Sequence, residues 1–555
     1  MADRKPFLPS SPRDHVFPRL TPAQLARIAA HGRLRPVAAG EVLLEAGEPT
    51  TRMFVVRSGQ IEVVRLGDVE QLVAVFEAGQ FTGEMNILTG RRSLARVGAT
   101  QSGEVVEVRR EDLLALVQTD AELSEILMRA FILRRVDLIA QEVGDVVLIG
   151  SVHSPATLRA KEFLTRNGHP HTYVDLDRDP DVQVLLDRFR VTAADIPVLV
   201  CRGTAVLRNP SNGQIADCLG FNEAIDQTHL HDVVIVGAGP SGLAAAVYGA
   251  SEGLDVLVLE SSAPGGQAGS SSRIENYLGF PTGIPGQELA ARAFSQAEKF
   301  GAHIAIAQSA TRLSCQRKPY SVRIDNGPDA PARTIIIATG AEYRKLSLDE
   351  ASRFEGAGVY HGATFIEAQL CRGQEVIVVG GGNSAGQAAV FLAQTAKRVH
   401  MLVRANGLAQ TMSRYLIRRI EESPDIVLHT QTEIVALEGE GALERVRCRR
   451  RGGDGVETHD VRHVFVMTGA VPSTAWLDGC VALDSHGFIK TGPDLTKEDL
   501  AAAEWPLKRL PYLLETTRPG VFAVGDVRAG NLKRVASAVG EGSTAIAFVH
   551  RVLSE

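Results

Sequence analysis

Short apolar runs alternate with helical patterns over the C-terminal part of the chain. Residues 233–236 and 376–379 are apolar runs of strand length, and each leads through a glycine-rich turn into a stretch with helical spacing. A second apolar run follows each stretch, at 255–259 and 399–403. Strand, helix and strand in this order are typical of a parallel sheet covered by helices. The pattern therefore predicts two doubly wound α/β units in one chain.

The N-terminal quarter of the chain has a different pattern. Short segments of alternating apolar and polar residues, separated by glycine turns, fill residues 41–75, and leucines at helical spacing follow over 112–139. Strands at this spacing predict a small β-roll followed by helices. Residues 1–14 are rich in Pro, Ser and Arg, so we expect a loose tail there rather than a signal peptide.

The segment between these two parts predicts a separate α/β domain. Its pattern indicates strand, helix, strand, helix and strand, at 145–150, 155–167, 171–175, 181–189 and 196–200. This order resembles a glutaredoxin- or thioredoxin-type domain, with Pro197 at the position of that fold's cis-proline. The stretch that should carry the redox motif, at 152–156, contains no thiol. We expect an adaptor without redox activity, and direct disulfide chemistry is the alternative.

Composition limits the possible partners. A chain of 555 residues is too long for one domain, and its hydrophobic content of 45% is ample for packed cores. A net charge of −6 leaves no basic footprint for nucleic acid. The most apolar stretch, at 233–250, is interrupted by Gly-Pro-Ser-Gly and predicts a buried strand and helix rather than a membrane span. We therefore expect a cytoplasmic protein without a membrane partner.

The first glycine-rich turn has the features of a dinucleotide site. One glycine allows the tight turn, a second lets a diphosphate approach the backbone, and a third lets helix pack on strand. The helix N-terminus then faces the phosphates. The next strand ends in Glu260, whose carboxylate can accept both ribose hydroxyls, which suits FAD or NAD. The candidate residues are Gly237, Gly239, Pro240, Ser241, Gly242 and Glu260.

The second glycine-rich turn has the same form, with the opposite charge after its strand. The strand at 399–403 is followed by Arg404, and a guanidinium at this position suits a 2′-phosphate, which favours NADPH. Two such turns predict two dinucleotides and therefore electron transfer. The candidate residues are Gly380, Gly382, Asn383, Ser384, Ala385 and Arg404.

From about residue 231 to the C-terminus the chain resembles low-molecular-weight thioredoxin reductase. The similarity lies in Gly265-Gly266-Gln267, Ile274-Glu275-Asn276-Tyr277, the signature at 281–286, Thr339-Gly340, Thr468-Gly469, Gly525-Asp526 and Lys533-Arg534-Val535-Ala536. The resemblance implies an FAD domain with an inserted NAD(P)H domain. It implies further FAD contacts for Gly266, Gln267, Asn276, Gly340, Gly525, Asp526, Arg534, Val535 and Ala536.

The resemblance leaves the reductant open. The family surrounds the 2′-phosphate with three basic residues, and only Arg404 remains here. NADPH is therefore favoured, while NADH or an electron-transfer protein stay as alternatives. The C-terminal helix, over about 534–550, would direct its N-terminal amides at the flavin and stabilise a reduced anionic ring.

The resemblance fails at the family's redox-active dithiol. The family places Cys-Ala-Thr-Cys before the second turn, and here Gly362 and Phe365 stand at the two cysteine positions. Neither residue can form a disulfide or a thiolate adduct with the flavin. No two of the six cysteines have Cys-x-x-Cys spacing: Cys201, Cys218, Cys315, Cys371, Cys448 and Cys480. We expect small buried residues in a reducing compartment, and a pair that is close only in space stays open.

A short glycine-glutamate turn in the N-terminal part resembles the phosphate-binding cassette of cyclic-nucleotide-binding domains. The matching residues are Gly83, Glu84, Arg92 and Ser93. That resemblance implies that Glu84 accepts a ribose hydroxyl and Arg92 pairs with the phosphate of cAMP or cGMP. Asn86 and Leu94 replace small residues of the pattern, so actual nucleotide binding stays open. The alternative is a vestigial sensor in which Glu84 and Arg92 pair with each other.

Together these features predict a multidomain α/β chain with a β-roll sensor domain, a thioredoxin-like adaptor and two Rossmann-like domains. The expected division is a disordered tail at 1–14, the sensor domain at 15–143, the adaptor at 144–228, the flavin domain at 229–346 and 472–555, and the NAD(P)H domain at 347–471. We expect a homodimer. No catalytic side chain and no metal site are predicted.

Two functions agree with this sequence. The first is an oxidoreductase that passes electrons from NAD(P)H through FAD to a quinone, ferredoxin, oxygen or small disulfide without a dithiol. The second is a sensor or scaffold that keeps FAD and has lost turnover. The intact FAD motifs favour the enzyme.

Overall fold

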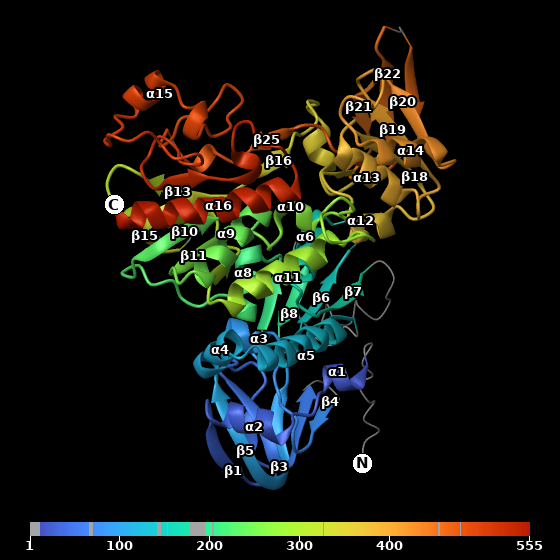
Figure 1. Cartoon of the computed structure of the whole chain (residues 1–555). Coiled ribbons are helices and arrows are strands. Elements are labelled where there is room, and N and C mark those ends of the chain that lie inside the picture. The colour runs from blue at the N-terminus through green and yellow to red at the C-terminus, as the bar shows by residue number, and fades with distance from the viewer. Residues whose placement is uncertain are drawn as a thin grey trace.

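The computed structural model describes residues 12–65, 70–140, 146–151, 154–176, 195–201, 205–325, 327–452, 455–477 and 479–555. Figure 1 shows the sensor domain at one end of an elongated molecule, the adaptor beside it, and the two dinucleotide-binding domains at the other end. The predicted multidomain α/β architecture is confirmed. The helix expected at 181–189 and part of the stretch at 152–156 lie outside the described residues.

The sensor domain is a five-stranded antiparallel β-roll with helices after it. Its strands are β1 (Arg33–Val37), β2 (Val42–Leu44), β3 (Arg52–Arg65), β4 (Gln71–Phe76) and β5 (Arg96–Arg109). Its helices are α1 (Arg13–Val16), α2 (Pro22–Ala29), α3 (Asn86–Thr89), α4 (Arg110–Thr119) and α5 (Ala121–Ala140). Helix α1 contains Arg13 and Asp14, which we expected in the loose tail. It contacts α5 and its Val16 is buried, which orders this part of the N-terminus.

The adaptor is a mixed four-stranded sheet in the order β7, β6, β8, β9. These strands are β6 (Val146–Gly150), β7 (Thr172–Asp175), β8 (Val198–Cys201) and β9 (Ala205–Arg208), with helices α6 (Pro155–Arg166) and α8 (Asn212–Leu219). Helix α6 begins at a Ser154 cap, whose hydroxyl accepts from the backbone amide of Thr157. The peptide bond before Pro197 is cis, as the resemblance to thioredoxin-type domains implied.

The flavin domain is built on a seven-stranded sheet with a parallel centre. Its strands are β10 (His231–Val236), β11 (Val256–Glu260), β12 (His303–Ile306), β13 (Ala310–Ser314), β14 (Tyr320–Ile324), β15 (Asp329–Ile337) and β26 (Val521–Ala523). Four helices matter for the site: α9 (Pro240–Ser251), α10 (Gly266–Gly269), α11 (Gly286–Lys299) and α16 (Val535–Ser554). The buried runs of β10 and β11 supply apolar residues to both faces of the sheet, as expected for parallel strands between two covering layers.

The NAD(P)H domain repeats the doubly wound plan. Its parallel sheet contains β17 (Val359–Tyr360), β24 (Val464–Val466), β18 (Glu375–Val379), β19 (Arg398–Val403) and β20 (Ile426–Thr430), in that spatial order. Helices α12 (Phe365–Leu370), α13 (Asn383–Leu392) and α14 (Arg414–Glu422) accompany it, and β21 (Thr432–Glu438), β22 (Arg445–Arg450) and β23 (Val456–His459) form a separate three-stranded sheet. An antiparallel pair, β16 (Ala341–Tyr343) and β25 (Ala470–Pro472), joins this domain to the flavin domain.

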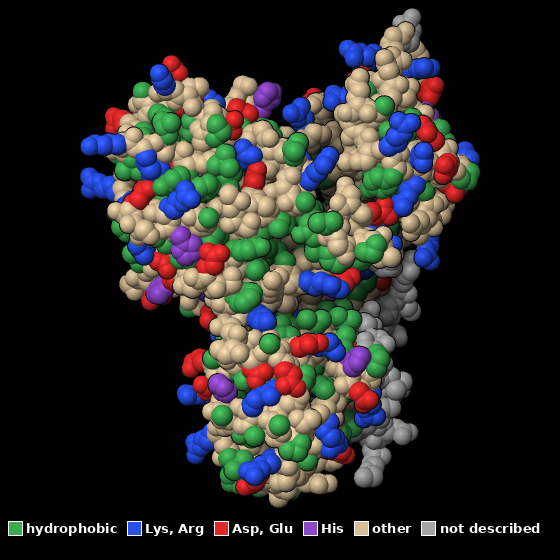
Figure 2. All heavy atoms as spheres, viewed as in Figure 1, with side chains coloured by type: hydrophobic (Ala, Val, Ile, Leu, Met, Phe, Trp, Pro, Cys, Tyr) green, Lys and Arg blue, Asp and Glu red, His purple; other side chains and the backbone are tan. Residues whose placement is uncertain are grey.

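Charged side chains of both signs are spread over the face of the molecule in Figure 2. In Figure 2, Lys and Arg side chains are interspersed with Asp and Glu rather than gathered into one basic patch. No helix among the described residues is long and apolar enough to cross a membrane.

Four of the six cysteines form disulfides, so the expectation of unpaired cysteines is wrong for these four. The bonds join Cys201 to Cys218 within the adaptor, and Cys315 to Cys480 within the flavin domain. The cysteines of the second bond are 165 residues apart in the sequence, so no local spacing predicts this disulfide. Cys371 and Cys448 are free and buried, and burial raises the pKa of Cys371 to about 11 and that of Cys448 to about 12. Their thiols therefore stay protonated at neutral pH.

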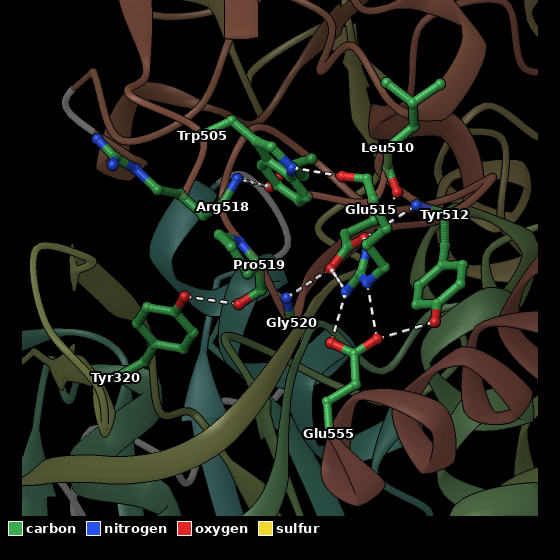
Figure 3. A network of polar contacts seen from close by, with 11 residues as sticks. Tyr320, Trp505, Leu510, Tyr512, Glu515, Arg518, Pro519, Gly520 and Glu555 are labelled. Carbon is green, nitrogen blue, oxygen red and sulfur yellow. Dashed lines mark hydrogen bonds and ion pairs between the residues drawn. The ribbon is translucent and has the colours of Figure 1, made fainter. Parts of the chain in front are cut away.

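The C-terminal end of α16 is held by a buried carboxylate, shown in Figure 3. Glu515 is fully buried, and its carboxylate accepts from the Gly520 amide at 2.8 Å and from Arg509 Nη1 at 2.6 Å. Arg509 Nε also donates to Glu555 Oε1 at 2.7 Å, and so does the Tyr512 hydroxyl at 2.9 Å. Because each charge has several partners, the network fixes the last residue of the chain to the loop before β26.

A second buried charge cluster joins the sensor domain to the flavin domain. Arg91, in the loop after α3, stacks its guanidinium 4.5 Å from the ring centre of Phe221 and 5.4 Å from that of Phe294 on α11. Glu298 lies near the end of α11 and is 8% exposed. Burial raises the pKa of Glu298 to about 8, although Arg91, Arg110 and Arg135 act in the opposite direction. Burial likewise lowers the pKa of Arg91 to about 10.

This cluster should make stability depend on pH. The folded-state pKa of Glu298 lies above the ordinary carboxyl value of 4.5, so its contribution is present at low pH and is lost as the pH rises toward about 8. Each unit of pKa difference is worth about 1.4 kcal/mol. Glu298→Gln should therefore raise the melting temperature relative to wild type at pH 8 and change it little at pH 5.

Glu288→Gln, on the exposed side of the same helix, is the matched control, because Glu288 forms only a surface pair with Arg292. Its melting temperature should follow that of wild type across the range. An equal shift for Glu298→Gln at pH 5 and pH 8 would contradict a buried ionisation at this interface.

Candidate flavin and nicotinamide sites

The first glycine-rich turn is closed so tightly that side chains are excluded. Gly237 follows β10 with φ at +103°, and a Cβ there would lie 2.4 Å from the carbonyl oxygen of Ala338. Gly239 is the residue before α9, whose N-terminus opens toward the turn. Gly266, from α10, lies against Gly239, with 3.1 Å between its Cβ position and the Gly239 Cα. The turn therefore presents bare backbone to any group bound above it.

Glu260 is fixed by the same turn. It ends β11 and is 7% exposed, and its Oε2 accepts from the Ala238 amide at 2.8 Å. Its Oε1 accepts from the amides of Ser262 at 2.8 Å and Ala263 at 3.1 Å. Burial raises the pKa of Glu260, and these amide contacts and the charge of Arg166 partly offset that effect. The carboxylate is thus oriented at the strand end, where a ribose would lie.

A cavity of about 530 Å³ extends from this turn across the flavin domain. That volume lies within the ~300–1,000 Å³ of small-molecule and cofactor pockets. Its walls include these predicted FAD residues: Gly237, Gly239, Pro240, Ser241, Glu260, Gly266, Gln267, Asn276, Gly340, Asp526, Arg534 and Val535. Gly242, Gly525 and Ala536 are not on its walls. Asn383 and Ser384 of the second turn reach the same cavity.

Another part of the cavity wall is formed by the start of α16 and the turn before it. Asp526 lines the cavity, and burial raises its pKa while the Lys533 charge acts in the opposite direction. The preceding Gly525 amide donates to Glu541 at 2.7 Å, which locks the turn to α16. Because α16 begins at Val535 on the cavity wall, its N-terminal amides and helix dipole face the space.

The second glycine-rich turn has the geometry of a dinucleotide turn. Gly380 has φ at +146°, and a Cβ there would lie 2.5 Å from the Met467 carbonyl oxygen. Asn383 Oδ1 accepts from the Ser413 amide at 2.7 Å, so this side chain braces the loop before α14. Arg404 lies directly after β19 and is exposed. Gly380, Gly382, Ala385 and Arg404 are not on the wall of the large cavity.

The loop at the family's dithiol position faces a smaller cavity of about 70 Å³ between the flavin and NAD(P)H domains. His361, Gly362 and Ala363 line one side, and Gln267 and Ser270 line the opposite side. No atom of the described residues lies within 4 Å of the position that a Cβ of Gly362 would take. No cysteine lines either of these two cavities, so neither disulfide takes the place of the dithiol there.

His361 is the residue of this loop with proton chemistry. Neither of its ring nitrogens makes a hydrogen bond with the described residues, and Glu355 lies 3.8 Å from its Nε2. Burial lowers the pKa of His361, so its imidazole is mostly neutral at pH 7. Sequence motifs did not single out this residue.

The sensor domain holds a cavity of about 90 Å³ inside the β-roll. Gly83, Glu84 and Ser93 line it, as the cassette resemblance implied, whereas Arg92 does not. Arg92 is exposed and donates to the Gly47 carbonyl at 3.3 Å. Glu84 pairs with Arg135 on α5 at 3.4 Å, so the expected alternative of a Glu84–Arg92 pair is wrong.

Three guanidinium groups line this cavity: those of Arg52 and Arg65 on β3 and that of Arg134 on α5. Arg134 is 5% exposed and lies 4.8 to 5.3 Å from the ring centres of Phe17, Phe76 and Phe81. Its Nη1 donates to the Gly83 carbonyl at 2.7 Å, while its Nη2 has no hydrogen-bond partner among the described residues. Burial lowers the pKa of Arg134 to about 9. Sequence reasoning missed it because a single arginine in a helical pattern gives no signal.

Two dinucleotide turns that meet at one cavity define a class of protein, the two-domain flavin and nicotinamide oxidoreductases. The sequence profile of the pyridine nucleotide-disulphide oxidoreductase family matches residues 231–542, and the chain belongs to this family. The profile of the cyclic nucleotide-binding domain matches residues 34–120. Both the thioredoxin reductase-like part and the sensor domain expected from the sequence are therefore confirmed.

The similar proteins are thioredoxin reductases. The chain is 30% identical to the thioredoxin reductase of Ureaplasma parvum over 326 residues, which cover 59% of this chain and 97% of that protein. It is 32% identical to the thioredoxin reductase of Escherichia coli O157:H7, over 58% of this chain and 95% of that protein. The crystal structure of Lactococcus lactis thioredoxin reductase matches with a TM-score of 0.52 at 26% identity, and covers 58% of this chain and 99% of that one.

Arg404 should set any preference for NADPH over NADH. A hydrogen bond between a guanidinium and a phosphate is worth roughly 1.5–3 kcal/mol. Arg404→Ala should therefore lower the affinity for NADPH by about tenfold or more and leave the affinity for NADH nearly unchanged. The affinities are measured from the dependence of flavin reduction on the dinucleotide concentration.

Arg398→Ala is the control, since Arg398 is an exposed arginine at the opposite end of the same strand. Arg398→Ala should leave the affinities for both dinucleotides unchanged. If Arg404→Ala lowered the affinities for NADPH and NADH equally, Arg404 would have a structural role only.

Proposed function

We propose that this protein is an NAD(P)H-dependent flavin oxidoreductase that delivers electrons from FAD directly to a small acceptor, without a Cys-x-x-Cys dithiol. The observation that carries the proposal is the loop at the dithiol position. It faces the interdomain cavity with Gly362, and the space beyond the Gly362 Cα is open. An acceptor in that space would stand where the family keeps its thiols.

The residues around the large cavity fit FAD. Bare amides of the Gly237 turn and the α9 N-terminus suit a diphosphate, and the Glu260 carboxylate suits a ribose. Asp526 would accept from a hydroxyl of the linking chain, and the α16 N-terminus would stabilise negative charge on the ring. When bound, FAD supplies the two-electron chemistry between the nicotinamide and the acceptor.

The acceptor side of the site also needs protons, because a quinone or a small disulfide takes up protons with its two electrons. The titratable side chains that line the smaller cavity are His361 and Tyr343. Burial raises the pKa of Tyr343 and lowers that of His361, so both are neutral at pH 7. His361 can take a proton at either ring nitrogen and pass it on, which makes it the better candidate for proton transfer.

The second candidate is a catalytically silent FAD protein that acts as a sensor or scaffold. It is favoured by the missing dithiol and by the thiol-free adaptor motif. The two candidates differ in one measurement, which is anaerobic reduction of the bound flavin by NADPH.

The purified protein should be yellow, and NADPH should bleach the flavin under anaerobic conditions. Thioredoxin reduction should be absent or very low, because Gly362 and Phe365 offer no thiol. Gly362→Leu should leave bleaching intact and slow turnover with a water-soluble quinone by about tenfold or more, the equivalent of ~1.4 kcal/mol, because it fills the open space.

The matched control is Gly455→Leu, at another open glycine far from the cavity, which should behave as wild type. Flavin that stays oxidised with both NADPH and NADH would favour the silent sensor. Vigorous thioredoxin reduction that survives replacement of each cysteine would leave the direct-transfer mechanism without support.

We further propose that the sensor domain binds a small anion such as cAMP or cGMP and thereby changes the rate of flavin reduction. A ligand can do so only if it binds two conformations unequally. Two arginines are the candidates tested for its anionic group: Arg92, which the cassette resemblance implies, and Arg134, which is the buried one of the three arginines that line the cavity.

Calorimetry with cAMP and cGMP separates these two roles. Because Arg134 lines the cavity, Arg134→Gln should lower the affinity for the nucleotide by about tenfold or more. Arg92→Ala should lower that affinity less. Arg134→Lys keeps the charge and replaces the Gln variant if that one does not fold. No binding of either nucleotide at millimolar concentration would favour a vestigial sensor or a different ligand.

A further inference from the structure

The adaptor forms part of the wall of the flavin cavity. The C-terminal end of α6 reaches the segment around α10, and Figure 1 shows α6 beside α10 and α11. Arg166 Nη2 donates to the Gly266 carbonyl at 2.8 Å, and Asn167 Nδ2 donates to the Ser262 carbonyl at 3.2 Å. From the opposite side, Gln287 Nε2 donates to the Thr165 carbonyl at 2.6 Å. Three hydrogen bonds thus hold this helix end against the flavin domain.

Arg166 does more than join the two domains, because it also lines the cavity. Its side chain is 17% exposed, and its Nε is buried without a hydrogen-bond partner among the described residues. Its positive charge lies close enough to Glu260 to lower the pKa of that carboxyl against the effect of burial. The Nη2 group of this guanidinium therefore donates to Gly266, while Nε has no polar partner among the described residues.

The distribution of charge along the cavity explains why a cation is useful here. The cationic side chains on its walls are Arg166, Lys533 and Arg534. Lys533 donates to the Asp526 carbonyl, and Arg534 immediately precedes α16, so both come from the segment that leads into α16. Arg166 is the cationic wall residue that contacts Gly266, which lies against Gly239 of the first turn, and it comes from another domain.

We propose that Arg166 is an FAD-binding residue that the adaptor supplies to the flavin domain, at the end of the cavity that takes the adenosine diphosphate half. This inference rests on the proposed function, namely that the large cavity binds FAD. A diphosphate brings two negative charges next to the buried carboxylate of Glu260. Amides of the turn and the α9 N-terminus offset part of that charge, and the guanidinium of Arg166 offsets a further part.

The position of Arg166 is set by its own helix as well as by Gly266. Glu162, one turn earlier on α6, lies 3.4 Å from Arg166 Nη1 and holds the guanidinium plane from the solvent side. The adaptor contributes through this arginine even though its expected redox motif contains no thiol. The role of the adaptor in this chain is then to help bind the flavin rather than to carry out disulfide chemistry.

The test is the affinity of the flavin-stripped full-length protein for FAD, followed by quenching of flavin fluorescence. Arg166→Ala should raise the Kd for FAD by about tenfold, as expected for loss of a charged hydrogen bond. Arg166→Lys should recover part of the loss. ADP should compete with FAD less well in Arg166→Ala than in wild type, while the affinity for riboflavin should stay within about twofold.

The riboflavin measurement distinguishes a binding role from a structural one. If Arg166 only joined the two domains, its removal would disturb the whole cavity. The affinities for riboflavin and for FAD would then fall equally. The matched control is Arg159→Ala, because Arg159 lies on the same helix and donates to the Pro210 carbonyl within the adaptor. That variant should bind FAD as wild type does.

Two failures have different signatures. A wild-type protein that binds neither FAD nor ADP would overturn the proposed function along with this inference. A wild type that binds FAD, with Arg166→Ala within twofold of it or with riboflavin weakened equally, would overturn only the role of Arg166.

Discussion

The structure depends on one constraint: a dinucleotide diphosphate must meet backbone amides with no side chain between them. At Gly237 that requirement removes the Cβ, since the Ala338 carbonyl oxygen occupies the space. The Ala238 amide of the same turn donates to Glu260, so the strand-end carboxylate is oriented by the glycine-rich loop itself. Parallel strands on both sides then fix the turn, because β10 pairs with β11 and β15. The cavity, the α9 N-terminus and the docking of α10 all follow from this arrangement.

Elements far apart in the sequence complete the site. The β16 and β25 pair returns the chain from the NAD(P)H domain, and α16 closes the cavity from the end of the sequence. Helix α11 contacts α10 and carries Phe294 and Glu298, which meet Arg91 of the sensor domain. A single helix therefore contacts both the segment beside the large cavity and the sensor domain. If the sensor domain regulates the flavin as proposed, a shift of that helix is the physical route.

Local patterns predicted what local physics determines. The glycine turns, the strand ends at Glu260 and Arg404, and the β-roll could be predicted because each depends on a few neighbouring residues. The Cys315–Cys480 disulfide could not, since its partners are 165 residues apart. Arg134 and Arg166 were missed for the same reason, because each acts on a cavity whose other walls come from distant segments. Arg92 matches the cassette pattern, yet tertiary packing turns it outward toward Gly47.

Loss of the dithiol changes what the rest of the chain must do. A thiol pair can carry electrons away from the flavin to a large partner, whereas an open space at Gly362 requires the acceptor to enter the interdomain cavity itself. Size then becomes the selective property, because a cavity of about 70 Å³ admits at most a small group and excludes a folded protein. The adaptor correspondingly has no thiol at the expected motif, and it contacts the adenosine end of the flavin cavity through Arg166. Both changes point the same way, from relayed electron transfer toward transfer at the flavin itself.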